Sequence, residues 1–176
     1  MDHGLELKFA GGAPVLTEGS VIEGYASLFG LTDQGGDAVL PGAFAASLKK
    51  LAGKGCKVRM LWQHDPTRPI GVWDEIREDG KGLWVKGRLL PDVAQAREAV
   101  ALIQAGAIDG LSIGYRTIRA EKDQKGRRML AEVDLWEVSL VTFPMLPEAR
   151  VGRNEADDLR EVAALFDAAA EALRDG

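Results

Sequence analysis

The stretch DGLSIGYRTIRA (109–120) and the stretch RMLAEVDLWEVSLVTF (128–143) flank a short polar loop, EKDQKG (121–126). Both stretches are rich in apolar, aromatic and β-branched residues, and the loop has the glycine and charged residues typical of a turn. The pattern predicts two long strands joined as a hairpin. The loop region is locally basic, and we interpret it as a solvated hairpin end rather than a partner-binding patch, because runs of charge usually mark exposed faces.

A half-buried strand is predicted upstream, over residues 56–62. Its alternating apolar positions are Cys56, Val58, Met60 and Trp62. This period of two is that of a strand with one face on the core. Continued past the end of the strand, the same alternation places His64 on the core-facing side.

A second hairpin is predicted from residues 70–77 and 82–89, which flank Asp79-Gly80. An Asp-Gly pair favours the positive φ angles of a tight hairpin turn. The 21 glycines of the chain are spread along the sequence at expected turns, a pattern more typical of many short strands than of a helical bundle.

Two helices interrupt this strand-rich pattern. Residues 42–52 have helical spacing and are followed by Gly53 as a stop. A second helix begins near Asp92, whose spacing to Gln95 is typical of a capping box, and ends at Gly106. The apolar positions are Phe44, Leu48 and Leu51 in the first and Val93, Ala96, Val100 and Ile103 in the second. Strands and helices together predict an α+β fold.

The 176 residues fit one domain of ordinary size and a tail. We expect a folded domain over residues 1–150 and an acidic, Ala-rich helix over residues 151–176, either docked on the domain or carried as a tail. The helix prediction depends on one apolar stripe formed by Leu159, Val162, Ala163, Phe166 and Ala170.

Composition narrows the class of protein. Lys and Arg number 22 against 27 Asp and Glu, and the net charge of −5 argues against nucleic acid as a main partner. The single cysteine, Cys56, cannot form an internal disulfide, and with two histidines it falls short of a structural zinc site. We therefore expect a reducing, intracellular setting and no metal. The sequence shows neither a signal-peptide pattern nor a run of ~18 apolar residues, so we expect neither export nor membrane insertion.

A serine and a histidine are candidates for hydrolytic chemistry. Ser112 lies between two glycines in the pattern G-x-S-x-G (110–114), which also occurs in α/β-hydrolases. Those enzymes place their histidine after the serine, and residues 113–176 contain none, so we reject that class. His64 is the remaining candidate base, since His3 belongs to the terminus and imidazole titrates near neutrality.

A carboxylate is expected behind the histidine, to orient the imidazole and stabilise its charged form. Glu137 is our choice, because it is an acid within an otherwise apolar strand, where an unpaired carboxylate would be costly to bury. Asp134 and Asp65 remain open as alternatives. A Glu137 side chain that simply points to water from the sheet face is the other interpretation.

Several stretches of the sequence resemble, in their order and in their residues, the prohead protease family of HK97-like phages. The matching stretches are GYASLF (24–29), DAVLPGAF (37–44), LWQHDP (61–66), GLSIGY (110–115) and EVSLVTFP (137–144). They span roughly residues 20–150. The resemblance implies that His64 and Ser112 are the catalytic pair and that Glu137 is the acidic third member. It also implies a fold similar to that of herpesvirus assembly proteases, a small, mostly antiparallel, closed or nearly closed β-barrel surrounded by helices.

The function implied by the resemblance is that of a serine endopeptidase without cofactor or metal. Its expected substrates are the scaffolding protein or the scaffolding segment of the major capsid protein, and itself. It would act inside the immature capsid, or prohead, in the cytoplasm of the bacterial host, with the major capsid protein as partner and with self-association as a further possibility. The alternative is a catalytically inactive capsid-assembly or scaffold module of the same fold.

Overall fold

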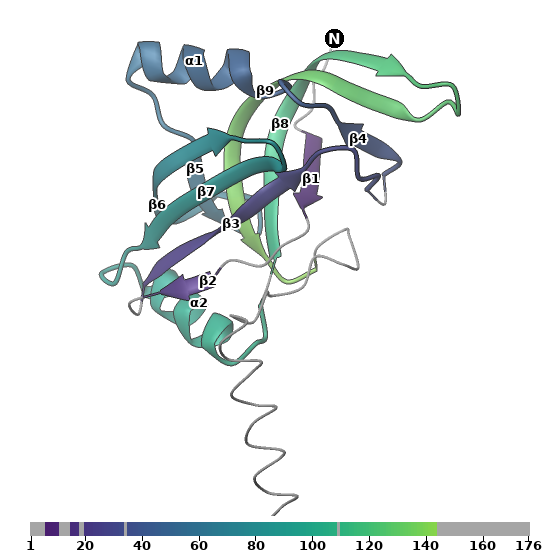
Figure 1. Cartoon of the computed structure of the whole chain (residues 1–176). Coiled ribbons are helices and arrows are strands. Elements are labelled where there is room, and N and C mark those ends of the chain that lie inside the picture. The colour runs from purple at the N-terminus through teal and green to yellow at the C-terminus, as the bar shows by residue number, and fades with distance from the viewer. Residues whose placement is uncertain (1–5, 11–14, 18–19, 34, 109, 144–176) are drawn as a thin grey trace, which may run out of the picture.

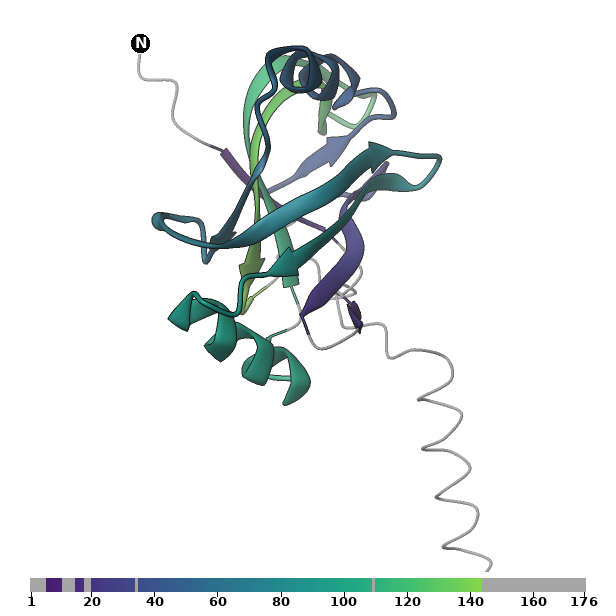
Figure 2. The same ribbon diagram turned by 90° about the vertical axis from the view of Figure 1, so that its left-hand side faces the viewer.

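One curled sheet carries two helices in the computed structural model, which describes residues 6–10, 15–17, 20–33, 35–108 and 110–143 (Figure 1). The strands are β1 (Glu6–Ala10), β2 (Val15–Thr17), β3 (Val21–Leu28), β4 (Asp37–Val39), β5 (Arg59–Trp62), β6 (Asp65–Glu78), β7 (Gly82–Leu89), β8 (Gly110–Lys122) and β9 (Arg128–Val141). The helices are α1 (Ala45–Lys54) and α2 (Ala94–Gln104), which lie at opposite ends of the sheet (Figure 2). Neither described helix is long and apolar enough to cross a membrane.

The strands follow the order β1-β8-β9-β5-β6-β7-β3-β2, and β4 pairs with the start of β9. Pairing is antiparallel except that β4 and β5 both run parallel to β9. The sheet curls until β3 approaches β1 and β8. The prediction of an α+β fold with a mostly antiparallel sheet is confirmed, although the sheet forms a half-barrel and not a closed barrel. The predicted C-terminal helix, and the division at residue 150, lie outside the described residues and stay predictions.

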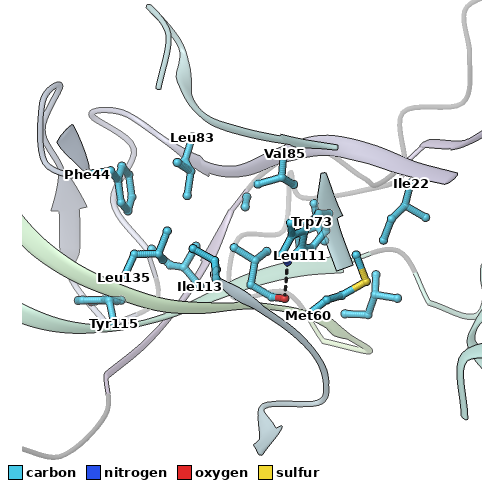
Figure 3. Packing of buried hydrophobic residues seen from close by; sticks show 14 of the residues in the cluster. Ile22, Phe44, Met60, Trp73, Leu83, Val85, Leu111, Ile113, Tyr115 and Leu135 are labelled. Carbon is cyan, nitrogen blue, oxygen red and sulfur yellow. Dashed lines mark hydrogen bonds between the residues drawn. The ribbon is translucent and has the colours of Figure 1, made fainter. Parts of the chain in front are cut away.

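The hydrophobic core fills the concave side of the sheet. Figure 3 shows Leu83 and Val85 of β7 approaching Leu111 and Ile113 of β8 across this interior. The indole Nε1 of Trp73 donates a hydrogen bond of 3.2 Å to the carbonyl oxygen of Val138, so its polar atom is satisfied within the core. Burial of such side chains contributes about 1.5–3 kcal/mol each.

Both predicted helices form, but their ends differ from the prediction. Gly53 lies inside α1, which ends at Lys54. The C-cap is Gly55, whose φ of 63° lets the following N–H of Cys56 bond back to Leu51 O at 3.0 Å. The predicted capping box of α2 is wrong. Val93 is the N-cap, and its apolar side chain accepts no hydrogen bond, while Gln95 bonds to Arg68 and Glu98.

The hairpin between β6 and β7 forms as predicted, but through different turn chemistry. Gly80 does not adopt a positive φ. The Asp79 carboxylate accepts hydrogen bonds from the N–H groups of Lys81 (2.8 Å) and Gly82 (3.2 Å), and this closes the turn. The side chain of the Asp therefore takes the role that the sequence pattern assigned to the glycine.

The hairpin of β8 and β9 extends beyond the rest of the sheet (Figure 1). Its arginines are ion-paired: Arg116 with Asp134, Arg119 with Glu121, Arg127 with Asp123 and Arg128 with Asp37. The arginines of the basic loop region are thus paired with carboxylates on an exposed ribbon, in line with the interpretation as a solvated hairpin end.

Helix α1 attaches to the part of β9 that lies between its β4 and β5 pairings. The backbone N–H of Leu135 donates to Ser47 Oγ at 2.9 Å, and that of Val133 donates to Ala43 O at 3.0 Å. The helix and its preceding loop therefore satisfy N–H groups that no neighbouring strand reaches.

Gly82 of β7 leaves no room for a side chain beside β3, and its replacement tests this packing. A Cβ there would overlap the backbone of Ser27 and lie 3.0 Å from Leu28 Cα, whereas a Cβ at Gly80 meets nothing within 4 Å. We expect Gly82→Ala to lower the free energy of unfolding in urea by about 1–3 kcal/mol, because backbone cannot yield as a flexible side chain can. Gly80→Ala is the matched control, and equal losses in the two variants would contradict this packing.

Candidate active site

Three neighbouring strands present one set of side chains on the sheet face opposite the core. In the registers β8–β9 and β5–β9, Ser112 pairs with Ser139, and Ser139 pairs with Leu61. One step along, Gly114 pairs with Glu137, and Glu137 pairs with Arg59. Paired residues project to the same face of a sheet. The alternate positions Met60, Leu111, Ile113, Val138 and Leu140 belong to the core cluster, so the six residues share the outer face.

His64 reaches this face through an unusual turn. Trp62 of β5 pairs directly with Asp65 of β6, which leaves Gln63 and His64 as a two-residue loop with φ angles of 52° and 61°. Positive φ at both central positions is the requirement of a type I′ hairpin turn. The prediction that strand alternation carries His64 to the core side is wrong, because the chain reverses at these residues. Cys56, predicted as an inward strand position, is exposed and precedes β5.

The imidazole of His64 contacts a buried carboxylate. Its Nδ1 lies 2.5 Å from Oε1 of Glu137, and Ser139 Oγ donates a hydrogen bond of 3.0 Å to Oε2 of the same carboxylate. Glu137 is only 3% exposed. The interpretation that Glu137 points to water is therefore wrong, and both of its oxygens have the partners that burial demands.

A β-bulge at Trp136 turns Glu137 toward this site. Tyr115 pairs with Leu135 while the preceding Gly114 pairs with Glu137, so Trp136 is an extra residue in β9 and is 45% exposed. The extra residue lets Leu135 and Val138 both face the core although they are three positions apart. Bulges commonly redirect side chains in this way next to functional sites.

Gly114 provides the space in which the Glu137 side chain lies. A Cβ at this position would overlap Glu137 Cγ and Oε1 and lie 2.8 Å from Cδ. Any larger residue on β8 would push the carboxylate away from His64. The glycine after Ser112 in the G-x-S-x-G pattern thus serves the acid on the next strand.

The two alternative acids have other partners. Asp134 accepts hydrogen bonds from Lys50 Nζ (3.0 Å), Arg116 Nη2 (3.3 Å) and Trp136 Nε1 (3.3 Å). Burial acts to raise the pKa of Asp134, but the hydrogen bonds from Lys50 and Trp136 and the charges of Lys50 and Arg116 outweigh it and lower the pKa. Asp65 accepts from the hydroxyl and the N–H of Thr67, which lower its pKa.

Ser112 lies near the start of β8, which is flanked there by β1 and β9, and it pairs with Phe9 and Ser139. The structure thus brings His64 and Glu137 into direct contact and places Ser112 beside Ser139, which bonds to Glu137. Ser139 was missed by sequence reasoning, although its spacing of two from Glu137 in a strand puts the two on one face. Among the described residues, no group of three or more His, Cys, Asp or Glu side chains is arranged to hold a metal ion.

Comparison with known proteins identifies the family of the chain. Residues 12–163 match the family described as Caudovirus prohead serine protease. The chain belongs to this family. The resemblance inferred from the five sequence stretches is therefore confirmed.

Relatives and a solved structure agree with this family. The chain is 35% identical over 156 residues to the prohead protease of Enterobacteria phage HK97, covering 87% of the chain and 66% of that protein. It is 33% identical over 116 residues to a capsid polyprotein of Pseudomonas phage PAJU2, covering 61% of the chain and 17% of that protein. The capsid assembly protease gp21 of bacteriophage T4 shares its fold, with a TM-score of 0.62 at 17% identity over 80% of this chain and 98% of that one.

Replacement of Gly114 tests its close approach to the Glu137 side chain. We expect Gly114→Ala to lower the free energy of unfolding by about 1–3 kcal/mol and to change the NMR signal of the His64 side chain, because the added methyl group displaces Glu137. Gly53→Ala in α1 is the control, since its Cβ meets nothing within 4 Å. An unchanged His64 signal in Gly114→Ala would show that the glycine does not position the acid.

Proposed function

We propose that the chain is a serine endopeptidase of prohead maturation in which Ser112 is the nucleophile, His64 the general base and Glu137 the residue that orients the base. The contact of 2.5 Å between His64 Nδ1 and Glu137 Oε1 carries this proposal. The contact lies on the same sheet face as Ser112, one strand away. A base held by a carboxylate beside a serine is the arrangement expected for acyl transfer.

The proposed reaction has two stages. With Nδ1–H donating to Glu137, the neutral imidazole accepts a proton at Nε2. Ser112 Oγ transfers its proton to His64 and bonds to the scissile carbonyl carbon, and the C–N bond then breaks as His64 passes the proton to the leaving amine. Water, deprotonated by His64, next attacks the acyl carbon, and the ester C–O bond breaks as His64 returns the proton to Ser112 Oγ, which regenerates the serine and releases the carboxylic acid product. Glu137 stabilises the imidazolium formed in each stage.

Access to the nucleophile requires movement of the protein. Ser112 has 0% exposed surface in the described state, as has Ser139 beside it. A peptide carbonyl can reach Ser112 Oγ only when the parts of this protein that cover the serine move aside. Binding of the substrate and opening of this face are therefore coupled steps in the proposed mechanism.

The proposed substrates are the scaffolding protein or the scaffolding segment of the major capsid protein, together with the chain itself. The relatives support this choice, since one is a prohead protease and another a capsid polyprotein. The proposed place of action is the interior of the immature capsid within the bacterial host. Confinement with the substrate raises its effective concentration, so weak intrinsic affinity is sufficient.

The second candidate function is an inactive assembly module of the same fold. The buried His64–Glu137 contact argues against it, because a scaffold gains more stability from apolar residues at such positions than from a buried polar pair.

Co-expression with the capsid protein tests the nucleophile and the base. We expect trimmed capsid protein with the wild-type chain and a loss of at least ~10³-fold in trimming rate with Ser112→Ala or His64→Ala, because members of a triad act as a unit. Intact mass spectrometry measures the products. Equal trimming by wild type and Ser112→Ala would sink the assignment, and absence of trimming by wild type would favour the inactive module.

Matched neutral variants test the acid. On a peptide spanning the mapped cleavage site, we expect Glu137→Gln to lower kcat by about 10²–10⁴-fold, since the amide fails to stabilise the imidazolium. Asp134→Asn, which disrupts contacts to Lys50 and Arg116 but none described to His64, should stay within about 3-fold of wild type. A larger loss in Asp134→Asn than in Glu137→Gln would show that the acid is misassigned.

A further inference from the structure

The side chain of Gln63 ties the His64 turn to the end of β9. Its Nε2 donates a hydrogen bond of 2.5 Å to Thr142 Oγ1, and its Oε1 accepts one of 3.3 Å from the Thr142 N–H. The backbone N–H of Gln63 also donates to Leu140 O at 2.9 Å. One residue thus makes three hydrogen bonds to the end of β9 and the residue just beyond it, with Leu140 and Thr142 lying 77 and 79 positions away in the sequence.

The turn needs such support because its residues do not favour its conformation. Positive φ at both Gln63 and His64 costs about 1–3 kcal/mol per residue for side chains other than glycine. The usual occupants of a type I′ turn are Asn-Gly or similar pairs. Pairing of β5 with β6 adds little, since its register is irregular at Met60, Leu61 and Trp62. The regular neighbour is β9, to which β5 is paired without interruption.

β9 and the residue that follows its end therefore hold the turn at two points. Thr142 binds the Gln63 amide, and Glu137, five positions earlier in the chain, contacts the His64 imidazole. A rigid strand that anchors both residues fixes the distance between the base and its carboxylate. Loss of the Thr142 anchor frees the turn from the end of β9, so that the His64 imidazole shifts relative to Glu137 even where the turn keeps its positive φ angles.

We propose that Gln63 is a positioning residue for the reaction and acts through His64. Its two side-chain hydrogen bonds to Thr142, called the clamp below, hold the turn that carries the imidazole. This inference depends on the proposed role of His64 as general base. Gln63 does not touch the reacting atoms in this account, and its effect is on the fraction of molecules in which His64 faces Ser112.

The variant Gln63→Asn tests the hydrogen bonds to Thr142 separately from the conformation of the turn. Asparagine adopts positive φ readily and keeps the amide, so the fold of the turn is retained, but it is one methylene too short to reach Thr142 as glutamine does. We expect kcat to fall by about 10- to 100-fold, with KM and the free energy of unfolding close to wild type, because small misplacement of a base is costly. Thr142→Val, which removes the hydroxyl but keeps the N–H, should lower kcat by a smaller factor.

Two further variants sharpen the test. The double variant Gln63→Asn/Thr142→Val should lose no more kcat than Gln63→Asn alone, because both changes remove the same interaction. Gln124→Ala, an exposed glutamine in the β8–β9 turn, is the matched control and should leave kcat unchanged.

The side-chain NMR signal of His64 gives a readout that a merely structural role would not move. The chain has two histidines, so a His3→Gln background leaves the single signal of His64. We expect this signal to shift and broaden in Gln63→Asn and in Thr142→Val. Unchanged kcat and an unchanged signal in both variants would overturn the proposal, as would a loss of kcat with an unmoved signal. Full cleavage by His64→Ala would instead overturn the proposed function, while the NMR signal would still decide whether the clamp holds the imidazole.

Discussion

The hydrogen bond between His64 and Glu137 is the interaction on which the site depends. Glu137 projects from the centre of the sheet, is almost fully buried and would be costly there without partners. The imidazole binds one carboxylate oxygen and the Ser139 hydroxyl binds the other. Each unusual feature nearby, namely the bulge, the close glycine and the strained turn, serves to make this one contact possible.

Long-range topology brings the three parts together. β9 lies between β8, which carries Ser112, and β5, which ends at the His64 turn. The parallel pairing of β5 with β9 places the end of β5 beside the end of β9. One central strand can therefore supply the acid, its second partner and the anchor for the turn, and all are held as rigidly as the sheet itself.

Much of this could be predicted from local patterns. The two hairpins and both helices follow from strand period and helical spacing, and the cost of burying a charge favours Glu137 as one candidate acid, whereas its burial is seen only in the structure. Other features depend on distant contacts. Alternation along 56–62 fails at His64 because Gln63 and His64 adopt positive φ, which is supported by bonds to Thr142. The bulge at Trp136 shifts the parity of β9 and has no local signature. The Asp92–Gln95 pattern fails as a cap because Gln95 has partners elsewhere.

A covalent probe of the nucleophile measures the central claim most directly. Reaction with diisopropyl fluorophosphate, followed by intact mass measurement and peptide mapping, reports which serine is activated by a base. We expect one adduct, on Ser112, in the wild-type chain, no adduct in His64→Ala and slower formation in Glu137→Gln. An adduct on Ser139 instead, or labelling of Ser112 at the same rate without His64, would contradict it.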